Sequence, residues 1–271
     1  MATDIDKELY TKRLQPYQDE IKAILAREKT MGKMIKKDDS GSGYKRLVLA
    51  EDMIYLATLY LAKQRLSIKI LKRKNEDSLN EARKALYKAI IQLEEIVTDY
   101  VDVPFSDYAE QVSHIKNLTP KQRFYLMRKL GLAINLVTNA YGENTKWKWS
   151  FVELLARYAT ISKNILDLKD VTENGLNPQS PDYEVAILHL RLTKKLLQKA
   201  ADQYREKYEL ATSSGTSEDF RRAINYLKAL RRLHLILNER NEAEEVKRKA
   251  EIWHDKMEKD SKKRRADRQG R

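Results

Sequence analysis

The feature of this sequence that most constrains its fold is its scarcity of helix-breaking residues. Only 8 glycines and 5 prolines interrupt its 271 residues, well under half of the roughly 12% found in an average protein. Apolar residues recur at spacings of three and four through most of the chain, and the alternation expected of strands is missing. The sequence therefore predicts an all-α protein with few tight turns.

Start and stop signals divide the chain into about eight helices. We expect Pro16 to kink or restart the first helix. Ser78 with Glu81 has the spacing of a capping box, and Thr119 with Pro120 is a typical helix start. The predicted helices span approximately residues 4–37, 44–74, 79–100, 107–117, 120–141, 145–170, 181–212 and 218–260. Either Thr145 or Ser150, which has Glu153 at the capping-box spacing, begins the sixth of them.

The second predicted helix, 44–74, carries apolar residues on more than one face and should therefore lie centrally in the core. Its longest apolar stretch, 53–62, is about half of the roughly 20 residues that span a bilayer, so we expect no transmembrane segment. Because 271 residues exceed the usual size of a single core, we expect an elongated irregular bundle, bent or two-lobed.

Breaks in the pattern predict the domain organisation. Asn174-Gly175 and Pro178 lie in 171–180, which we interpret as a linker between an N-terminal helical lobe, 1–170, and a long C-terminal helical hairpin, 181–260. Residues 261–271 hold six cations and one acid, and we expect this basic tail to be disordered.

An apolar seam runs through the last predicted helix. Its members are separated by three or four residues, while nearly all of their neighbours are charged: Ala243, Val246, Ala250, Trp253 and Met257. So narrow a seam needs a partner helix. We expect that partner to be the 181–212 helix folded back alongside; the alternative is a helix of another chain.

Nothing in the sequence indicates catalysis. There is no cysteine, which excludes thiolate chemistry and disulfides. The four histidines lie in separate segments without the spacing of a metal site, and no glycine-rich phosphate loop is present. We therefore expect no catalytic residue, no metal and no cofactor, and predict that the chain is not an enzyme.

Two aromatic clusters are candidate partner-binding sites. Lys146, Trp147, Lys148 and Trp149 place two indoles and two cations in consecutive positions near a helix start, where all four cannot face inward. A proline-containing segment carries the second cluster: Val103, Phe105 and Tyr108. Aromatic side chains with polar ends are favoured at interfaces. For each cluster, ordinary packing in the core is the alternative.

The segments 43–71, GYKRLVLAEDMIYLATLYLAKQRLSIKIL, and 146–158, KWKWSFVELLARY, resemble the flagellar coiling proteins of spirochaetes. That family has no short catalytic signature, so the resemblance transfers no site residue. It implies an elongated helical protein of the periplasm that lies on the flagellar filament as part of its sheath, contributes to filament curvature and motility, and binds the filament core and other sheath proteins.

Charge supports a different interpretation. The net charge of +13 attracts anionic partners, so the alternative function is a basic helical nucleic-acid-binding protein of the cytoplasm. No recognised nucleic-acid module is present. Residues 1–15 contain no apolar secretory segment, which predicts a cytoplasmic protein. A periplasmic location would require Met1 to replace a removed signal peptide.

Overall fold

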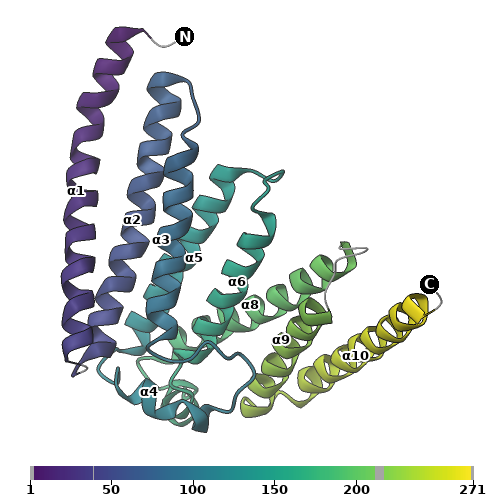
Figure 1. Cartoon of the computed structure of the whole chain (residues 1–271). Helices are drawn as coiled ribbons and strands as arrows, with labels where there is room; N and C mark the ends of the chain where they lie inside the picture. Colours follow the sequence, from purple (N-terminus) through teal and green to yellow (C-terminus); the bar gives the residue numbers. More distant parts are fainter. Residues whose placement is uncertain (1–2, 39, 211–216, 270–271) are drawn as a thin grey trace. The chain divides into compact units, whose positions relative to one another are not determined.

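The computed structural model describes residues 3–38, 40–210 and 217–269, with side chains as far as Lys263. These residues form helices and loops with no strand, which confirms the predicted all-α class (Figure 1). The chain divides into two compact units. Unit 1 comprises Met1–Val97 and Gln111–Lys148, and unit 2 comprises Thr98–Glu110 and Trp149–Arg271.

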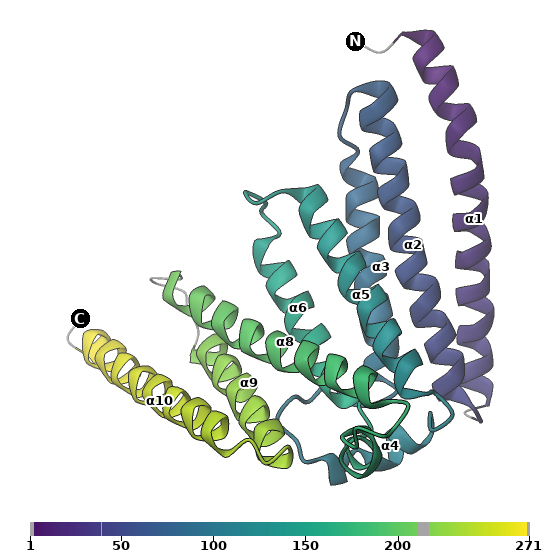
Figure 2. The same cartoon turned by 180° about the vertical axis from the view of Figure 1, so that it is seen from behind.

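Unit 1 is built around a central helix. Its elements are α1 (Asp4–Lys37), α2 (Ser42–Leu71), α3 (Glu76–Glu94) and α5 (Pro120–Tyr141), with the end of α4 (Ala109–Ser113). Helix α2 packs against α1, α3 and α5, and residues such as Met53, Ile54 and Leu56, which point to different sides of it, are buried. The predicted central position of this segment is confirmed. Figure 2 shows α1, α2 and α5 side by side.

Helix caps explain where these elements begin. Thr119 forms the predicted start of α5, accepting a hydrogen bond from the backbone N–H of Gln122. The predicted capping box at Ser78 is wrong: Asn75 caps α3 and accepts from the Ser78 N–H at 2.9 Å. Either an asparagine or a serine side chain can satisfy an open N–H, and here the earlier residue does so. Pro16 lies inside α1, which continues to Lys37.

Unit 2 contains the C-terminal helices. Its elements are η1 (Phe105–Asp107), α6 (Lys148–Asn164), α7 (Leu168–Asp170), the π-helical turn η2 (Val171–Gly175), α8 (Tyr183–Leu210), α9 (Ser217–Ile236) and α10 (Arg240–Gln269). The ring of Phe220 on α9 stacks on Tyr208 of α8, with centroids 4.5 Å apart. It also lies 6.0 Å from Trp253 of α10. These aromatic contacts join α8, α9 and α10.

The predicted apolar seam of the last helix faces helices of the same chain. Ala243, Val246 and Trp253 are buried, and α10 packs along α9. Side chains also connect α10 to α8, where Asp260 accepts a hydrogen bond from Tyr208 at 2.9 Å. The partner within the chain is therefore α9 together with α8, rather than α8 alone as the sequence predicts.

Two predicted boundaries differ from the structure. The predicted linker, 171–180, lies inside unit 2, because its first half is a packed π-helical turn: a Cβ added at Gly175 would lie 3.0 Å from the Cβ of Ala186. The predicted disordered tail also differs, since α10 continues as a helix to Gln269. Lysine, arginine, alanine and glutamine favour helical backbone even where little packs against them.

Candidate functional site

The first predicted cluster contains a stacked indole. Trp147 lies in the turn between α5 and α6, and its ring faces the guanidinium of Arg83 from α3, 3.8 Å from the ring centroid. The ammonium of Lys146 lies 5.5 Å from the same ring. Because a cation over the face of an indole is held by the ring quadrupole, Trp147 is fixed in place although its side chain is only half-buried. We call these three residues the Trp147 platform.

The rest of this cluster is divided between the two units. Lys148 is exposed and belongs to unit 1, whereas Trp149 is half-buried and belongs to unit 2. Both make interactions within the protein. Trp147 with Lys146 is the part of this cluster that the structure presents as a platform, and a surface role for Lys148 and Trp149 stays a prediction.

The second predicted cluster belongs to unit 2. Tyr108 is buried, and its ring meets Phe105 edge-on with centroids 5.4 Å apart. Val103 and Phe105 are half-buried. For Tyr108, the packing alternative therefore holds, because a buried ring cannot contact a partner. A surface role for Val103 and Phe105 stays a prediction.

Tyr108 borders a polar site, centred on Lys163, that the sequence did not suggest. Lys163, on α6, is buried, and its ammonium donates to Asn164 Oδ1 at 2.8 Å. It also approaches the Val103 carbonyl and the Tyr108 hydroxyl, each at 3.4 Å. The same ammonium lies 5.0 Å from the centroid of the Tyr108 ring. One lysine side chain thus contacts three residues around it.

Two further side chains, Asn164 and Arg232, hold the 98–110 segment through three hydrogen bonds. The side-chain amide of Asn164 donates to the carbonyls of Thr98 and Tyr100, at 2.9 and 3.0 Å. Arg232, on α9, donates to the carboxylate of Asp102 at 2.9 Å. Because buried carbonyls without partners are costly, these bonds allow this irregular, partly exposed segment to pack against α6 and α9 of unit 2.

Burial governs the electrostatics of this site. It lowers the pKa of Lys163 to about 8, because an ammonium loses hydration there, and the nearby positive charge of Arg232 lowers it further while Asp102 opposes the change. Burial also raises the pKa of the Tyr108 hydroxyl. A lysine with a pKa near neutrality is a candidate nucleophile. However, Lys163 is only 2% exposed, so the arrangement best fits a clamp for the 98–110 segment.

Sequence reasoning missed this clamp, although a signal was present. Ser162, Lys163 and Asn164 are consecutive polar residues at the end of a helix that is otherwise buried on nearly every side. Ser162 is likewise satisfied internally, since its carbonyl lies 3.1 Å from His189 Nε2 and its hydroxyl 2.8 Å from Thr193 Oγ1. Polar residues without an outward face predict an internal network.

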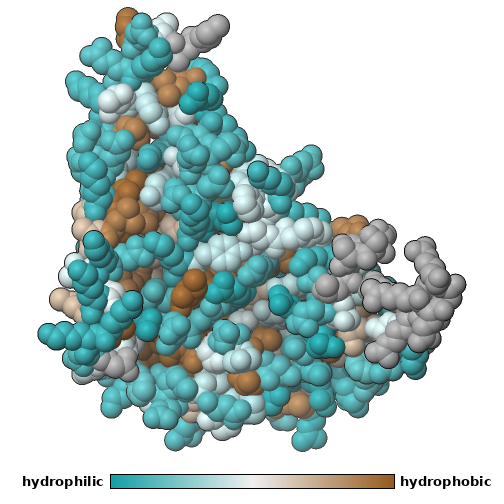
Figure 3. All heavy atoms as spheres, in the orientation of Figure 1, coloured by the Kyte–Doolittle hydropathy of each residue, from teal (hydrophilic) through white to brown (hydrophobic). Residues whose placement is uncertain are grey.

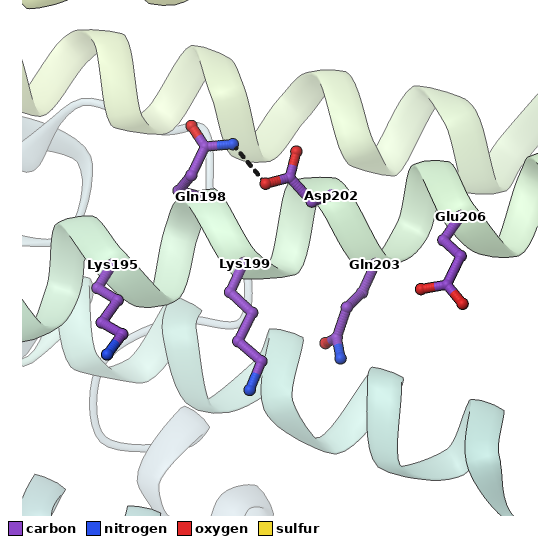
Figure 4. Close-up of a pocket in the computed structure, with 6 residues that line it drawn as sticks. All are labelled: Lys195, Gln198, Lys199, Asp202, Gln203 and Glu206. Atoms are coloured by element: carbon purple, nitrogen blue, oxygen red, sulfur yellow. Dashed lines mark hydrogen bonds between the residues drawn. The ribbon is translucent and has the colours of Figure 1, made fainter.

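A shallow hollow of about 390 Å³ lies along α8. Figure 4 shows its six lining side chains, all from that helix: Lys195, Gln198, Lys199, Asp202, Gln203 and Glu206. The only hydrogen bond drawn among them runs from Gln198 to Asp202, at 2.8 Å. Because one helix provides every lining residue, the hollow lacks the converging groups of a ligand pocket.

Neither a metal-binding cluster nor a membrane-spanning helix occurs among the residues that the structure describes. Among them, no group of three or more histidine, aspartate and glutamate side chains could hold a metal ion. His234 Nδ1 lies 2.6 Å from Glu239 Oε2, so this histidine has a hydrogen-bond partner within the protein. No helix in the described part of the chain combines the length and apolar character required to cross a bilayer.

The fold and these two clusters define an all-helical protein with an aromatic platform around Trp147 and an internal hydrogen-bonded clamp around Lys163. The chain belongs to the TP0443 family, whose model matches residues 6–261. No curated protein matches it. Among solved structures it is similar to a chain titled "DHF58 filament", with 14% identity, coverage of 95% of this chain and 97% of that one, and a TM-score of 0.37. A TM-score this low supports no inference.

Proposed function

We propose that this chain is a non-enzymatic structural protein that binds other proteins through its folded helical surface. The observation that carries the proposal is the Trp147 platform, in which the guanidinium of Arg83 and the ammonium of Lys146 both lie near the indole ring. Tryptophan and arginine are the residues most enriched among interface hot spots. A ring fixed before binding loses little conformational freedom when a partner arrives.

The partner that we propose is the periplasmic flagellar filament, where the protein would form part of the sheath and contribute to curvature. This choice rests on the resemblance of segments 43–71 and 146–158 to flagellar coiling proteins. Long helices with charged surfaces suit such a role, because a coat needs extended lateral contacts rather than a closed pocket. A periplasmic location is part of the same proposal.

Co-sedimentation with purified periplasmic flagellar filaments tests the proposal. We expect the parent protein to pellet with filaments and Trp147→Ala to bind at least about 30-fold more weakly, the equivalent of about 2 kcal/mol for a central aromatic anchor. Trp253→Phe is the matched control, since Trp253 is buried between helices of unit 2. Binding should survive in this control. Failure of the parent to pellet would contradict the filament assignment.

Nucleic-acid binding is the second candidate, and the observation that favours it is the run of cations from Lys262 to Arg265 within a chain of net charge +13. Contacts with phosphates would make binding steeply salt-dependent and insensitive to sequence. The Trp147 platform would then contribute little. Duplex DNA binding at two salt concentrations separates this candidate from the first.

A further inference from the structure

One face of unit 1 exposes apolar side chains from two neighbouring helices. Val48 and Tyr55 lie on α2, and Tyr125 and Leu132 lie on α5. All four are substantially exposed, and Leu132 reaches 60%. We call these four residues the α2–α5 patch. Large apolar side chains grouped in this way are typical of protein interaction sites.

An ion pair shows that the four residues form one surface. Glu51 on α2 receives a hydrogen bond from Lys129 on α5 at 2.8 Å. Val48 and Tyr55 lie three residues before and four after Glu51, while Tyr125 and Leu132 lie four before and three after Lys129. Residues at these spacings share one face of a helix. The patch therefore surrounds the Glu51–Lys129 pair.

The relative direction of α2 and α5 places the residues of the patch in two rows. Near the start of both helices, the Tyr44 hydroxyl accepts from the Asn117 N–H at 3.1 Å. Beyond the end of α2, the Lys74 ammonium donates to the carbonyl of Tyr141, the last residue of α5, at 3.3 Å. The helices therefore run parallel. Figure 2 shows α2 and α5 side by side. Counted from the Glu51–Lys129 pair, Val48 lies near the level of Tyr125, and Tyr55 near the level of Leu132.

The rim of the patch is positively charged. On α5, Lys121 and Arg128 are exposed, and their cationic groups lie over aromatic rings of the same helix, 6.0 Å from the Tyr125 centroid and 5.8 Å from the Phe124 centroid. In the described part of the chain neither cation forms an ion pair, whereas the neighbouring Lys129 is paired with Glu51. The partner that fits this patch therefore presents apolar side chains bordered by acidic groups.

The first two turns of α1 present apolar side chains bordered by acidic groups. Ile5 and Leu9 are four residues apart on one face of the helix, and Ile5 is 78% exposed. The acids of this stretch are Asp4, Asp6 and Glu8, against the single cation Lys7. Apolar surface also appears along α1 and α2 on the face drawn in Figure 3, which is otherwise mostly hydrophilic. We call residues 4–9 the α1 acidic turn.

The acidic turn cannot reach the patch of its own chain. Asp6 lies close enough to Lys72 for that cation to lower its pKa, after the larger effect of its hydrogen bonds with Thr3. Lys72 is the residue that follows α2, about 20 residues beyond Glu51, or roughly 30 Å along a helix. Occupation of the patch by this turn therefore requires a second molecule.

We propose that a second copy of this chain places its α1 acidic turn on the α2–α5 patch. Ile5 and Leu9 would cover the apolar rows while the acids face Lys121 and Arg128. The two surfaces differ, so the contact is head-to-tail and leaves one of each surface open in every dimer. A contact of this size is small, so we expect weak, salt-sensitive association that adds further copies as concentration rises.

Sedimentation velocity of the full chain up to millimolar concentration at low salt tests this proposal. One variant, Ile5→Lys with Glu8→Lys, blocks the acidic turn, and another, Lys121→Glu with Leu132→Glu, blocks the patch. Each blocked variant alone should remain monomeric. Their mixture should form a one-to-one complex and nothing larger, because one intact surface of each kind is present.

Controls distinguish this contact from general stickiness or unfolding. Ile252→Lys removes an apolar side chain of similar exposure, 66%, outside both surfaces and should self-associate like the parent. Circular dichroism should show unchanged helicity in every variant. A parent that stays monomeric throughout the concentration range would overturn the proposal. So would self-association that persists in either blocked variant, because the contact would then lie elsewhere.

Discussion

The guanidinium of Arg83 lies over the face of Trp147, 3.8 Å from the ring centroid, although 64 positions separate the two residues along the chain. Arg83 comes from α3 and Trp147 from the turn before α6. Arg83 also forms a hydrogen bond with Tyr141, at the end of α5. One arginine side chain therefore fixes the platform to two helices of unit 1.

Replacing Arg83 tests how the platform is held. We expect Arg83→Leu to shift the Trp147 emission to longer wavelength and to lower the free energy of unfolding by about 1 kcal/mol, since a cation–π contact at a partly exposed site is worth about that much. Fluorescence is read in a background where Trp149 and Trp253 are phenylalanine. Arg83→Lys is the matched control: it keeps the charge but loses planar stacking, so its shift should be intermediate. Unchanged emission in both variants would contradict the stacked geometry.

Lys163 should make the stability of the protein depend on pH. The folded pKa is about 8, while an unfolded lysine titrates near its ordinary value of about 10.4. Between these values the unfolded chain binds more protons, so stability rises with pH in this window. Below about pH 8, both states are protonated and the full cost of burying the charge is present.

Comparison with Lys163→Met isolates this contribution. The variant keeps most of the side-chain volume and removes the charge. Other titrating groups, such as Tyr108, are present in both proteins, so their contributions largely cancel in the difference between the two. From pH 7 to 9.5, the parent should gain about 2 kcal/mol of unfolding free energy relative to the variant. Denaturant unfolding at several pH values measures this gain. A difference that does not change with pH would mean that the ammonium remains well hydrated.

The backbone conformation of Asn238, in the turn between α9 and α10, leads to a prediction about the free energy of unfolding. Asn238 has a φ of 57°, in the left-handed region that asparagine and glycine tolerate better than other residues. We expect Asn238→Val to lower the free energy of unfolding by roughly 1 to 2 kcal/mol, and Asn238→Gly to be nearly neutral. Thermal unfolding of both variants measures this. Equal losses would show that a side-chain contact of Asn238 matters instead of its backbone.

The basic tail should contribute little to stability. Deleting 261–271 removes a segment without apolar anchors, so we expect the melting temperature to stay within error of the parent. Asp260→Ala is the contrasting variant, because the Asp260 carboxylate accepts a hydrogen bond from Tyr208 at 2.9 Å, and its removal should destabilise unit 2. A clear fall in melting temperature on deletion would show that the tail is docked.

Local patterns in the sequence were enough to predict the helices but not the clamp. Helix periodicity and the Thr119 cap depend on residues within a few positions of each other, and both predictions are confirmed. The contact of Lys163 with Tyr108 joins residues 55 positions apart, which no local pattern indicates. The predicted linker at 171–180 failed similarly, since the packing of Gly175 against Ala186 depends on the tertiary fold.

The central claim is that folded aromatic surface, rather than the charge of the tail, recognises the partner. The most direct measurement compares the parent, Trp147→Ala and the 261–271 deletion for co-sedimentation with purified periplasmic flagellar filaments and for duplex DNA binding at two salt concentrations. We predict filament binding that falls in the helical Trp147→Ala variant and survives the deletion. Salt-sensitive DNA binding that is lost with the tail, without filament association, would contradict the account.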